Sequence, residues 1–394
     1  MAQPTDGDAA MVRRRPRDRR ERILASAARQ FWEQGYQQVA MADIGSAVGI
    51  GASALYRHFR GKADLLAAVL DETVGHLEQA VSVAPDLDGQ LTSVAEAALR
   101  HREFAVLWDR ESGHLPEPER ARLRDRRRAV VDRVARSVSP RPGAELRTRA
   151  VVAVLESVSY HRVEIEHGEF VQLLRQACQA VLAAPLAETA ARTGPSGGQP
   201  QLPVSRREAL LAAASRLFAE RGFPSVSLGD VGAATGIAGP SVYNHFDSKA
   251  ELLLSILNRG NEVLWFGLHR ALDTADGPAD ALERVLDSYV NAFTSDPSLV
   301  SVLLTEIANL PAEQRERFHR VQHDYVVEWV ALLRRWRPEL IEPTARILVH
   351  AALGVANSLA GTRASALPER PAPHTGIVAL ASAVLHTGRP VSEP

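Results

Sequence analysis

The sequence predicts an all-α protein made of two tandem units, each with a three-helix helix-turn-helix domain followed by a larger helical domain. The first indication is an internal repeat, in which residues 24–36 match residues 211–223 at a constant offset of 187. The second is the recurrence of apolar residues at i, i+3, i+4 and i+7, which is typical of an amphipathic helix. The third is the lack of the sustained alternation of polar and apolar residues that half-buried strands show.

The repeat extends well beyond its first helix. It covers about 45 positions without a gap and pairs residues 56–59, Tyr-Arg-His-Phe, with residues 243–246, Tyr-Asn-His-Phe. Further on, at an offset of 195, the Leu-Pro pair at 115–116 resembles the pair at 310–311. We therefore expect the whole two-part unit to be duplicated.

The domain boundaries follow from the repeat and from composition. Residues 194–203 are dense in glycine and proline, so they cannot bury a core and are expected to form part of a flexible linker. A Gly-x-Ser-x-Gly pattern at 194–198 lies in that linker with no strand before it, which argues against hydrolase chemistry. The expected domains are a basic disordered arm (1–18), helix-turn-helix domain 1 (19–66), helical domain 1 (67–184), the linker (185–204), helix-turn-helix domain 2 (205–253) and helical domain 2 (254–394).

Composition narrows the class of protein. A net charge of -1 with 24% charged residues argues against a uniformly basic coat but leaves room for local basic patches. The single cysteine, Cys178, excludes an intramolecular disulfide and a cysteine-cluster metal site, and we expect it to be a small buried residue. The amino terminus is arginine-rich without an apolar run, and the longest apolar stretches are too short to span a bilayer. We expect a cytoplasmic protein with no membrane association, cofactor or metal.

Two short helices joined by a glycine turn are expected in each repeat. In the first, residues 42–48 and 52–58 flank Gly49; in the second, residues 229–235 and 239–245 flank Gly236. Such a pair is a helix-turn-helix, whose second helix enters the major groove of DNA.

The two segments 31–66 and 218–253 closely resemble the TetR family of transcriptional regulators. Both carry Phe-x-x-x-Gly-Tyr/Phe, an Asp-Ile/Val pair, a Gly-Ile turn and Tyr-x-His-Phe-x-x-Lys-x-x-Leu-Leu. The resemblance implies that each remaining helical region binds a small ligand and forms a dimer interface. It also implies that Tyr56 and Tyr243 donate their hydroxyls to phosphates.

The residues expected to contact double-stranded operator DNA lie in the basic segments and around the two recognition helices. Lys62 and Lys249 would add a cation beside the DNA backbone, and Arg57 and Asn244 would favour guanine and adenine respectively. The arginine run could enter a minor groove, or it could be a solvated tail. The full set is Arg13, Arg14, Arg15, Arg17, Arg19, Arg20, Ala52, Ser53, Tyr56, Arg57, His58, Lys62, Arg206, Arg207, Ser227, Gly239, Ser241, Tyr243, Asn244, His245 and Lys249.

The two units differ in their helix caps. Ser227 is expected to cap the second helix of its repeat with Asp230 as its partner, whereas the first repeat has Ala40 there. Gly51 and Ala238 also replace the usual Ser/Thr cap of the third helix. One unit is therefore expected to bind DNA more weakly.

The second helical domain is the expected effector site because it is richer in aromatic residues. The positions matching Tyr325 and Trp329 in the first unit are Val130 and Val134. An apolar small molecule is the expected ligand. The expected lining residues are Trp265, Tyr289, Phe293, Glu306, Asn309, Tyr325, Trp329, His350 and Asn357, although aromatic residues at helical spacing are more often core than pocket.

Three hypotheses about function remain. The first is a non-enzymatic regulator, expected to be a repressor, whose units pair within one chain through residues 144–183 and 343–388 on an operator with unequal half-sites. In the second, one helix-turn-helix is vestigial and a homodimer of chains binds the DNA. The third is an all-helical enzyme or scaffold, which would show no salt-dependent DNA binding.

Overall fold

The computed structural model describes residues 16–139, 141–186, 205–236, 239–361 and 372–389. Throughout this part of the chain the regular structure is helical and no strand occurs, which confirms the all-α prediction. Residues 187–204 of the expected linker (185–204) and residues 1–15 of the expected arm (1–18) lie outside the described residues.

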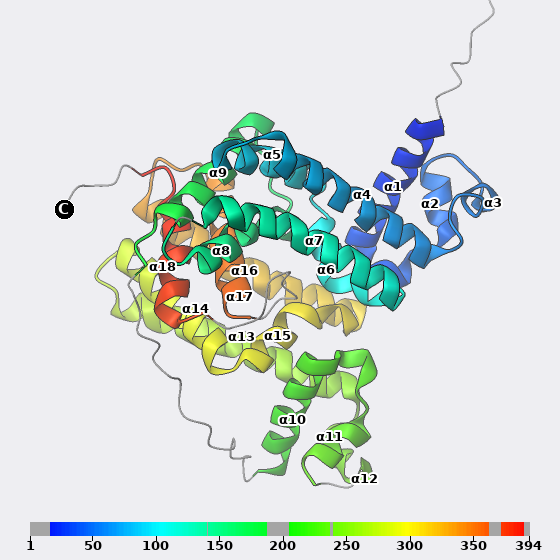
Figure 1. Cartoon of the computed structure of the whole chain (residues 1–394). Helices are drawn as coiled ribbons and strands as arrows, with labels where there is room; N and C mark the ends of the chain where they lie inside the picture. The colour runs from blue at the N-terminus through cyan, green and yellow to red at the C-terminus, as the bar shows by residue number, and fades with distance from the viewer. Residues whose placement is uncertain (1–15, 140, 187–204, 237–238, 362–371, 390–394) are drawn as a thin grey trace, which may run out of the picture.

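The two units repeat the same order of helices, nine in each within the described residues (Figure 1). The first unit comprises α1 (Pro16–Gln34), α2 (Met41–Ala47), α3 (Ala52–Leu55), α4 (Lys62–Val83), α5 (Leu87–Arg100), α6 (Phe104–Glu111), α7 (Glu117–Val138), α8 (Ala144–Glu156) and α9 (His167–Ala183). The second comprises α10 (Arg206–Arg221), α11 (Leu228–Ala234), α12 (Gly239–Val242), α13 (Lys249–Thr274), α14 (Pro278–Ser295), α15 (Pro297–Thr305), α16 (Ala312–Trp336), α17 (Glu342–Leu359) and α18 (His374–Leu385). Short 3₁₀ turns are η1 (Tyr36–Gln38), η2 (Ser112–His114), η3 (Ser157–Tyr160), η4 (Phe223–Ser225) and η5 (Ile307–Asn309).

Each helix-turn-helix has its own core, closed by the amphipathic first helix. Phe31 and Phe218 are fully buried at matching positions of α1 and α10, because the apolar stripe of each helix faces its two short neighbours. Glycine makes the turn between those neighbours. Gly49 and Gly236 have φ values of 72° and 69°, a left-handed conformation that costs glycine little.

The recognition helices are shorter than expected. They end at Leu55 and Val242 instead of at the two histidines, and the following residues form a hydrogen-bonded turn in which the N–H of Phe59 donates to the carbonyl of Leu55 at 3.0 Å. The expected arm is likewise partly helical, because α1 begins at Pro16, a residue that suits the first turn of a helix.

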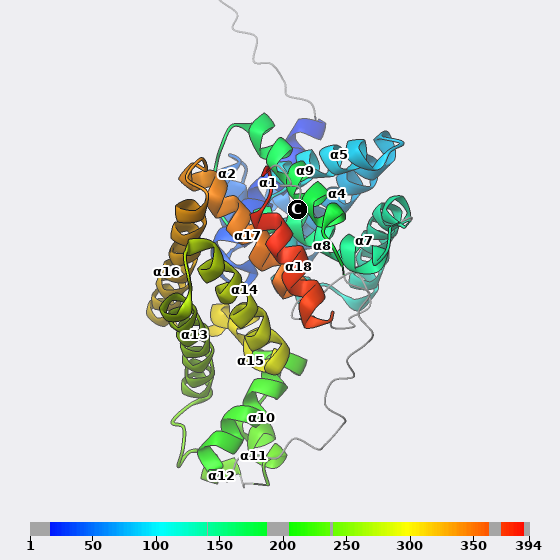
Figure 2. The same cartoon turned by 90° about the vertical axis from the view of Figure 1, so that its left-hand side faces the viewer.

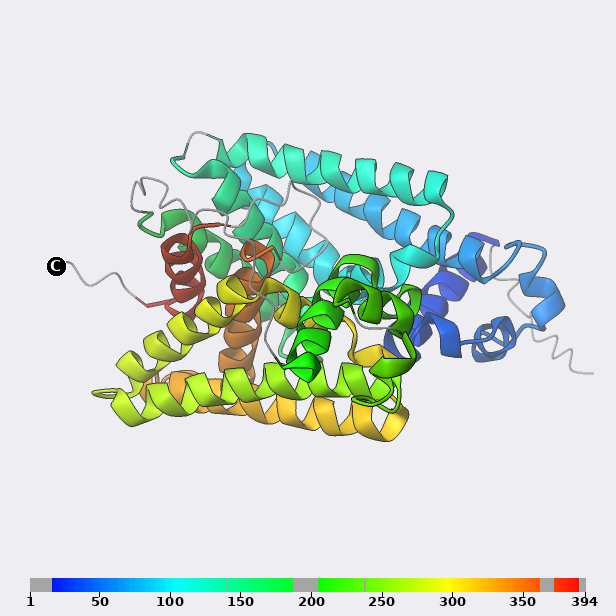
Figure 3. The same ribbon diagram turned by 90° about the horizontal axis from the view of Figure 1, so that it is seen from below.

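The second half of each unit is a helical body, and the two bodies meet along their last helices. α8 packs on α17, and α9 packs on α18 (Figure 2). Figure 3 shows α4 and α7 along one side of this junction and α13 and α16 along the other. One continuous apolar core includes residues of both bodies, and Cys178 is fully buried in it.

Close backbone approach and a buried arginine hold the junction together. A Cβ added at Gly354 of α17 would lie 3.3 Å from the carbonyl oxygen of Ala153 in α8, so even an alanine there would require the two helices to shift by a few tenths of an ångström. The Arg149 guanidinium crosses from α8 and donates to the carbonyl of Ser358 at 2.8 Å, near the end of α17. Carbonyls at a helix end lack partners within the helix, so this contact stabilises α17 across the boundary between the units.

Candidate nucleic-acid interface and internal cavity

The tyrosines that follow α3 and α12 project into solvent. Tyr56 is 56% exposed and Tyr243 is 59% exposed, although the residues immediately before them, Leu55 and Val242, are fully buried. Large aromatic residues seldom lie so open without a partner. The same exposure at two matching positions marks two equivalent surfaces.

The other predicted DNA-contacting residues around these helices are on or near the same surfaces. Ser53, Arg57, His58 and Asn244 are exposed, and Ser241 and His245 are half-buried. Ala52 and Gly239 are the first residues of α3 and α12. The two surfaces differ chemically, because an arginine in the first stands where the second has an asparagine.

A cation–π contact holds the first helix of each unit against the recognition segment. The Arg20 guanidinium lies 5.9 Å from the centre of the Phe59 ring, and that of Arg207 lies 4.7 Å from the Phe246 ring. Both arginines are exposed, as are Arg19 and Arg206. Arg19 and Arg20 belong to α1, within the expected first helix-turn-helix domain, and their contact with DNA stays a prediction. Arg17 is also in α1, whereas Arg13, Arg14 and Arg15 lie outside the described residues.

The two lysines predicted to face the DNA backbone instead bind the protein's own backbone. The Lys62 Nζ donates to the carbonyls of Tyr36 at 2.7 Å and Val39 at 3.0 Å. The Lys249 Nζ donates to those of Phe223 and Val226, both at 2.8 Å. Each ammonium also lies over an aromatic ring, at 4.4 Å from the centre of Tyr36 and 4.2 Å from that of Phe223. Each ammonium therefore donates to backbone carbonyls of its own domain, which the sequence pattern does not show, and a contact of either lysine with a DNA phosphate stays a prediction.

The capping difference between the units is present in the structure. The Ser227 hydroxyl accepts from the Asp230 N–H at 3.1 Å, and the Asp230 carboxylate accepts from the Ser227 N–H at 2.7 Å. The Ser227 hydroxyl also donates to the Asp230 carboxylate, and this bond together with the one from the Ser227 N–H holds the pKa of Asp230 below its usual value. In the first unit Asp43 accepts from the Ala40 N–H at 2.9 Å, but alanine offers no acceptor in return. Ser227 is exposed, and its contact with phosphate stays a prediction.

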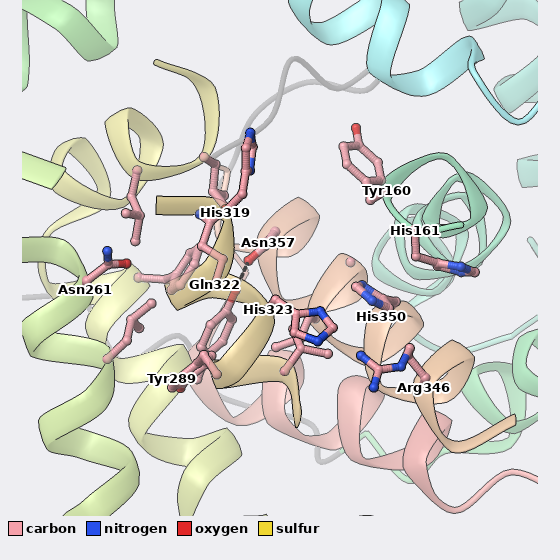
Figure 4. A pocket seen from close by; sticks show the side chains of 18 of the residues that line it. Tyr160, His161, Asn261, Tyr289, His319, Gln322, His323, Arg346, His350 and Asn357 are labelled. Atoms are coloured by element: carbon pink, nitrogen blue, oxygen red, sulfur yellow. Dashed lines mark hydrogen bonds between the residues drawn. The ribbon is translucent and has the colours of Figure 1, made fainter. Parts of the chain in front are cut away.

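A cavity of about 750 Å³ lies inside the second body and extends to the first (Figure 4). Helices α13 to α17 form most of its wall, and residues 160–163 of the first unit close one side. Six of the nine predicted ligand-binding residues line it, namely Trp265, Tyr289, Phe293, Tyr325, His350 and Asn357. The Tyr289 hydroxyl donates to Asn357 Oδ1 at 2.8 Å, and burial raises the pKa of Tyr325.

Three predicted ligand-binding residues are not part of the cavity wall. Trp329 is fully buried behind it. Glu306 accepts from the Phe223 N–H at 3.2 Å and from Asn309 Nδ2 at 2.7 Å, so this pair joins the end of α15 to the helix-turn-helix of the second unit. Burial raises the pKa of Glu306, and the nearby charge of Lys249 opposes that shift. Contrary to our expectation, these three residues do not line the cavity, and no ligand contact is proposed for them.

The corresponding region of the first unit is nearly filled. Its cavity is about 60 Å³ and is lined by Val130 and Val134, where the second unit has Tyr325 and Trp329. A buried ion pair also borders it, in which Arg127 Nη2 lies 2.6 Å from Glu156 Oε1. A space of that size holds a few water molecules and no effector.

The repeated helix-turn-helix is found independently by comparison with protein families. A model described as bacterial regulatory proteins, tetR family, matches residues 23–69 and again residues 210–256. A model described as tetracyclin repressor-like, C-terminal domain, matches residues 275–361. The chain belongs to the TetR family. It carries two TetR-like units in tandem, as the internal repeat predicts.

Among TetR-family relatives, the transcriptional activator FasR of Mycolicibacterium smegmatis is 34% identical over 118 residues, which is 28% of this chain and 54% of that protein. The transcriptional repressor KstR2 of the same organism is 35% identical over 94 residues, covering 24% of this chain and 44% of that protein. The chain thus spans about half the length of these curated relatives. A solved structure of the ketosteroid transcriptional regulator KstR2 of Mycobacterium tuberculosis matches with a TM-score of 0.40 and 21% identity, covering 46% of this chain and 94% of that one.

Sequence reasoning missed several polar residues of the cavity in this TetR-like body. His319, Gln322 and His323 lie on the cavity side of α16, and Arg346 lies on α17 one turn before His350. The i, i+3, i+4 spacing of the three α16 residues was a signal that could have found them. The contribution of residues 160–163 had no such signal, because it depends on how the two bodies pack.

Proposed function

We propose that this chain is a DNA-binding transcription regulator whose two helix-turn-helix units read one operator as an intramolecular pseudo-dimer. The observation that carries the proposal is the pair of exposed tyrosines, Tyr56 and Tyr243, in two units whose bodies are joined along α8 and α17. Two such units fused by an apolar core present two readers at a fixed separation, as dimeric helix-turn-helix proteins do.

The two readers are proposed to bind unequal half-sites. Arg57 and Asn244 occupy matching exposed positions, and the geometry of these side chains suits guanine and adenine respectively. A palindromic operator would place one of the two opposite the wrong base, at a cost of about 1–3 kcal/mol per mismatched contact.

Control by a small molecule is proposed to act through α15. Leu303 and Leu304 of this helix line the large cavity, and Glu306 at its end holds Phe223 of the second helix-turn-helix. A ligand that prefers another position of α15 would thereby shift the population away from the DNA-competent arrangement.

We propose repression released by the ligand, as the relatives named KstR2 are called repressors. Because FasR is called an activator, a reporter gene behind the operator tests the direction of control.

The test is binding of the full chain to a duplex carrying the region upstream of its own gene, with the tyrosines changed one at a time. We expect Tyr56→Phe and Tyr243→Phe each to weaken binding about tenfold, because each removes one hydroxyl donor to a phosphate. Tyr36→Phe is the matched control, since residue 223 at the corresponding position is already phenylalanine.

The outcomes separate the three hypotheses. Similar losses from both variants support the pseudo-dimer. A loss from only one of them would favour a vestigial helix-turn-helix and a homodimer of chains. Absence of salt-dependent binding by the unchanged protein would contradict DNA recognition altogether and leave an all-helical enzyme or scaffold.

A further inference from the structure

One end of the large cavity is built by both units. His161 of the first unit stacks on His350 of the second, with ring centres 4.8 Å apart. Arg346 lies one turn before His350 on α17, and Figure 4 shows all three side chains together at this end. We call these three residues the junction cluster. The rest of the wall includes apolar side chains such as Leu264, Phe293 and Leu353.

The ionisable basic side chains of the cavity wall have no acidic counterpart in the wall itself. Among the described residues that line the cavity are two arginines and four histidines but no aspartate or glutamate. Glu342 lies outside the wall and holds Arg346 Nη2 at 2.6 Å, which fixes the direction of the guanidinium while leaving it further N–H donors. Arginine is the residue that most readily recognises carboxylate and phosphate groups.

The His161 ring, which is part of the cavity wall, has a buried donor without a partner. Its Nδ1 accepts from the Val163 N–H at 3.2 Å, so in the neutral ring the proton resides on Nε2. Burial and the neighbouring cations lower the pKa of His161 to about 2, which keeps the ring neutral near pH 7. That Nε2 is buried and has no hydrogen-bond partner among the described residues. An unpaired buried donor is costly unless a bound group accepts from it.

The position of His161 is held rigidly by the first unit. Arg102 donates to the backbone carbonyls of Val158 at 3.2 Å, His161 at 2.8 Å and Val163 at 3.0 Å. The wall segment that includes His161 also contacts the first helix-turn-helix. The Arg162 guanidinium lies 4.9 Å from the centre of the Trp32 ring, and its Nη1 is 4.0 Å from Glu33 Oε1, both in α1.

We propose that the cavity binds one acidic amphiphile per chain, with its acid group at the junction cluster and its apolar body among α13 to α17. Because the corresponding cavity of the first unit is only about 60 Å³, we expect one site of this kind per chain. Because α15 connects the cavity to the second helix-turn-helix and residues 160–163 connect it to the first, a single bound molecule acts on both readers. This last consequence rests on the proposed function, whereas binding itself does not.

The experiment is isothermal titration calorimetry of the full chain with four probes that share a twelve-carbon tail: dodecanoate, dodecyl phosphate, dodecan-1-ol and dodecyltrimethylammonium. We expect one site per chain and binding of an acidic probe at least tenfold tighter than that of the alcohol or the ammonium. The tighter of dodecanoate and dodecyl phosphate identifies the acid as carboxylate or phosphate. Two sites per chain, equal affinity for the alcohol, or no binding of either acidic probe would overturn the proposal.

Three variants locate the acid group. Arg346→Gln is expected to abolish the preference for acidic probes, whereas Arg346→Lys retains most of it. His161→Phe keeps the stacking on His350 but removes the donor, and we expect about tenfold weaker binding of the acidic probe. Unchanged affinity in His161→Phe would contradict a site shared by the units. Arg284→Gln is the matched control, since Arg284 pairs with Asp280 on α14 and does not line the cavity.

DNA binding is measured separately, so the two proposals fail in different ways. If the unchanged chain does not bind the upstream duplex, the proposed function falls, and the calorimetry still decides on the ligand. If it binds the duplex and dodecanoate but dodecanoate leaves DNA affinity unchanged, the link between the cavity and the readers is contradicted.

Discussion

Lys62 and Lys249 show how a motif residue can be located correctly from the sequence and still have hydrogen-bond partners that the sequence does not predict. Their position at the start of α4 and α13 follows from the repeat, but their hydrogen bonds depend on where the turns η1 and η4 place their carbonyls. Sequence alone does not reveal those carbonyls, because an exposed lysine and one bonded to backbone are equally compatible with the pattern. The exposed tyrosines, in contrast, were predicted from the repeat together with the family resemblance.

The residue-scale prediction concerns Lys249. We expect Lys249→Met to lower the free energy of unfolding by about 1 kcal/mol, because two carbonyls lose their donor while water replaces part of the loss. The salt dependence of DNA binding should stay the same, since no phosphate contact is removed. Chemical denaturation and DNA titrations at several salt concentrations measure the two effects. Arg206→Gln is the comparison, because Arg206 is an exposed residue expected to contact DNA, so its loss should reduce the salt dependence without lowering stability. A smaller salt dependence with unchanged stability would contradict this expectation and indicate that Lys249 contacts a phosphate.

At the scale of helices, the sequence predicts which helices exist and in what order more accurately than it predicts the residues at which they end. The repeat and the apolar spacing identify α1 to α3 and α10 to α12, because local pattern and tertiary packing agree there. The recognition helices nevertheless end at Leu55 and Val242, where burial of the following phenylalanines pulls the chain into a turn. The cavity wall was predicted only in part, since it combines five helices of one unit with a segment of the other.

The prediction for helices uses the two unequal caps. Ser227→Ala should destabilise the second helix-turn-helix by about 1 kcal/mol, and Ala40→Ser should stabilise the first by a similar amount. Both changes act on a helix start whose N–H groups otherwise lack partners. Thermal unfolding and amide hydrogen exchange of α2 and α11 report the result. If the two substitutions changed stability in the same direction, or if hydrogen exchange changed outside α2 and α11, the proposed role of these caps would be contradicted.

At the scale of the whole molecule, the junction of α8, α9, α17 and α18 joins the two units. It buries a continuous apolar core and contains the crossing Arg149 contact, so the two units form one body over the described residues. No helix in that part of the chain is long and apolar enough to cross a membrane. The expectation of paired terminal helices came from the family resemblance. The sequence did not predict that residues of both units line the large cavity, because this depends on which surfaces of the two bodies meet.

The most direct test of this account is the mass of the complex between the full chain and its operator-containing duplex, measured by native mass spectrometry. We predict one chain of 42.8 kDa per duplex, with binding weakened by a change in either half-site. Two chains per duplex, each using one helix-turn-helix, would contradict the intramolecular pseudo-dimer.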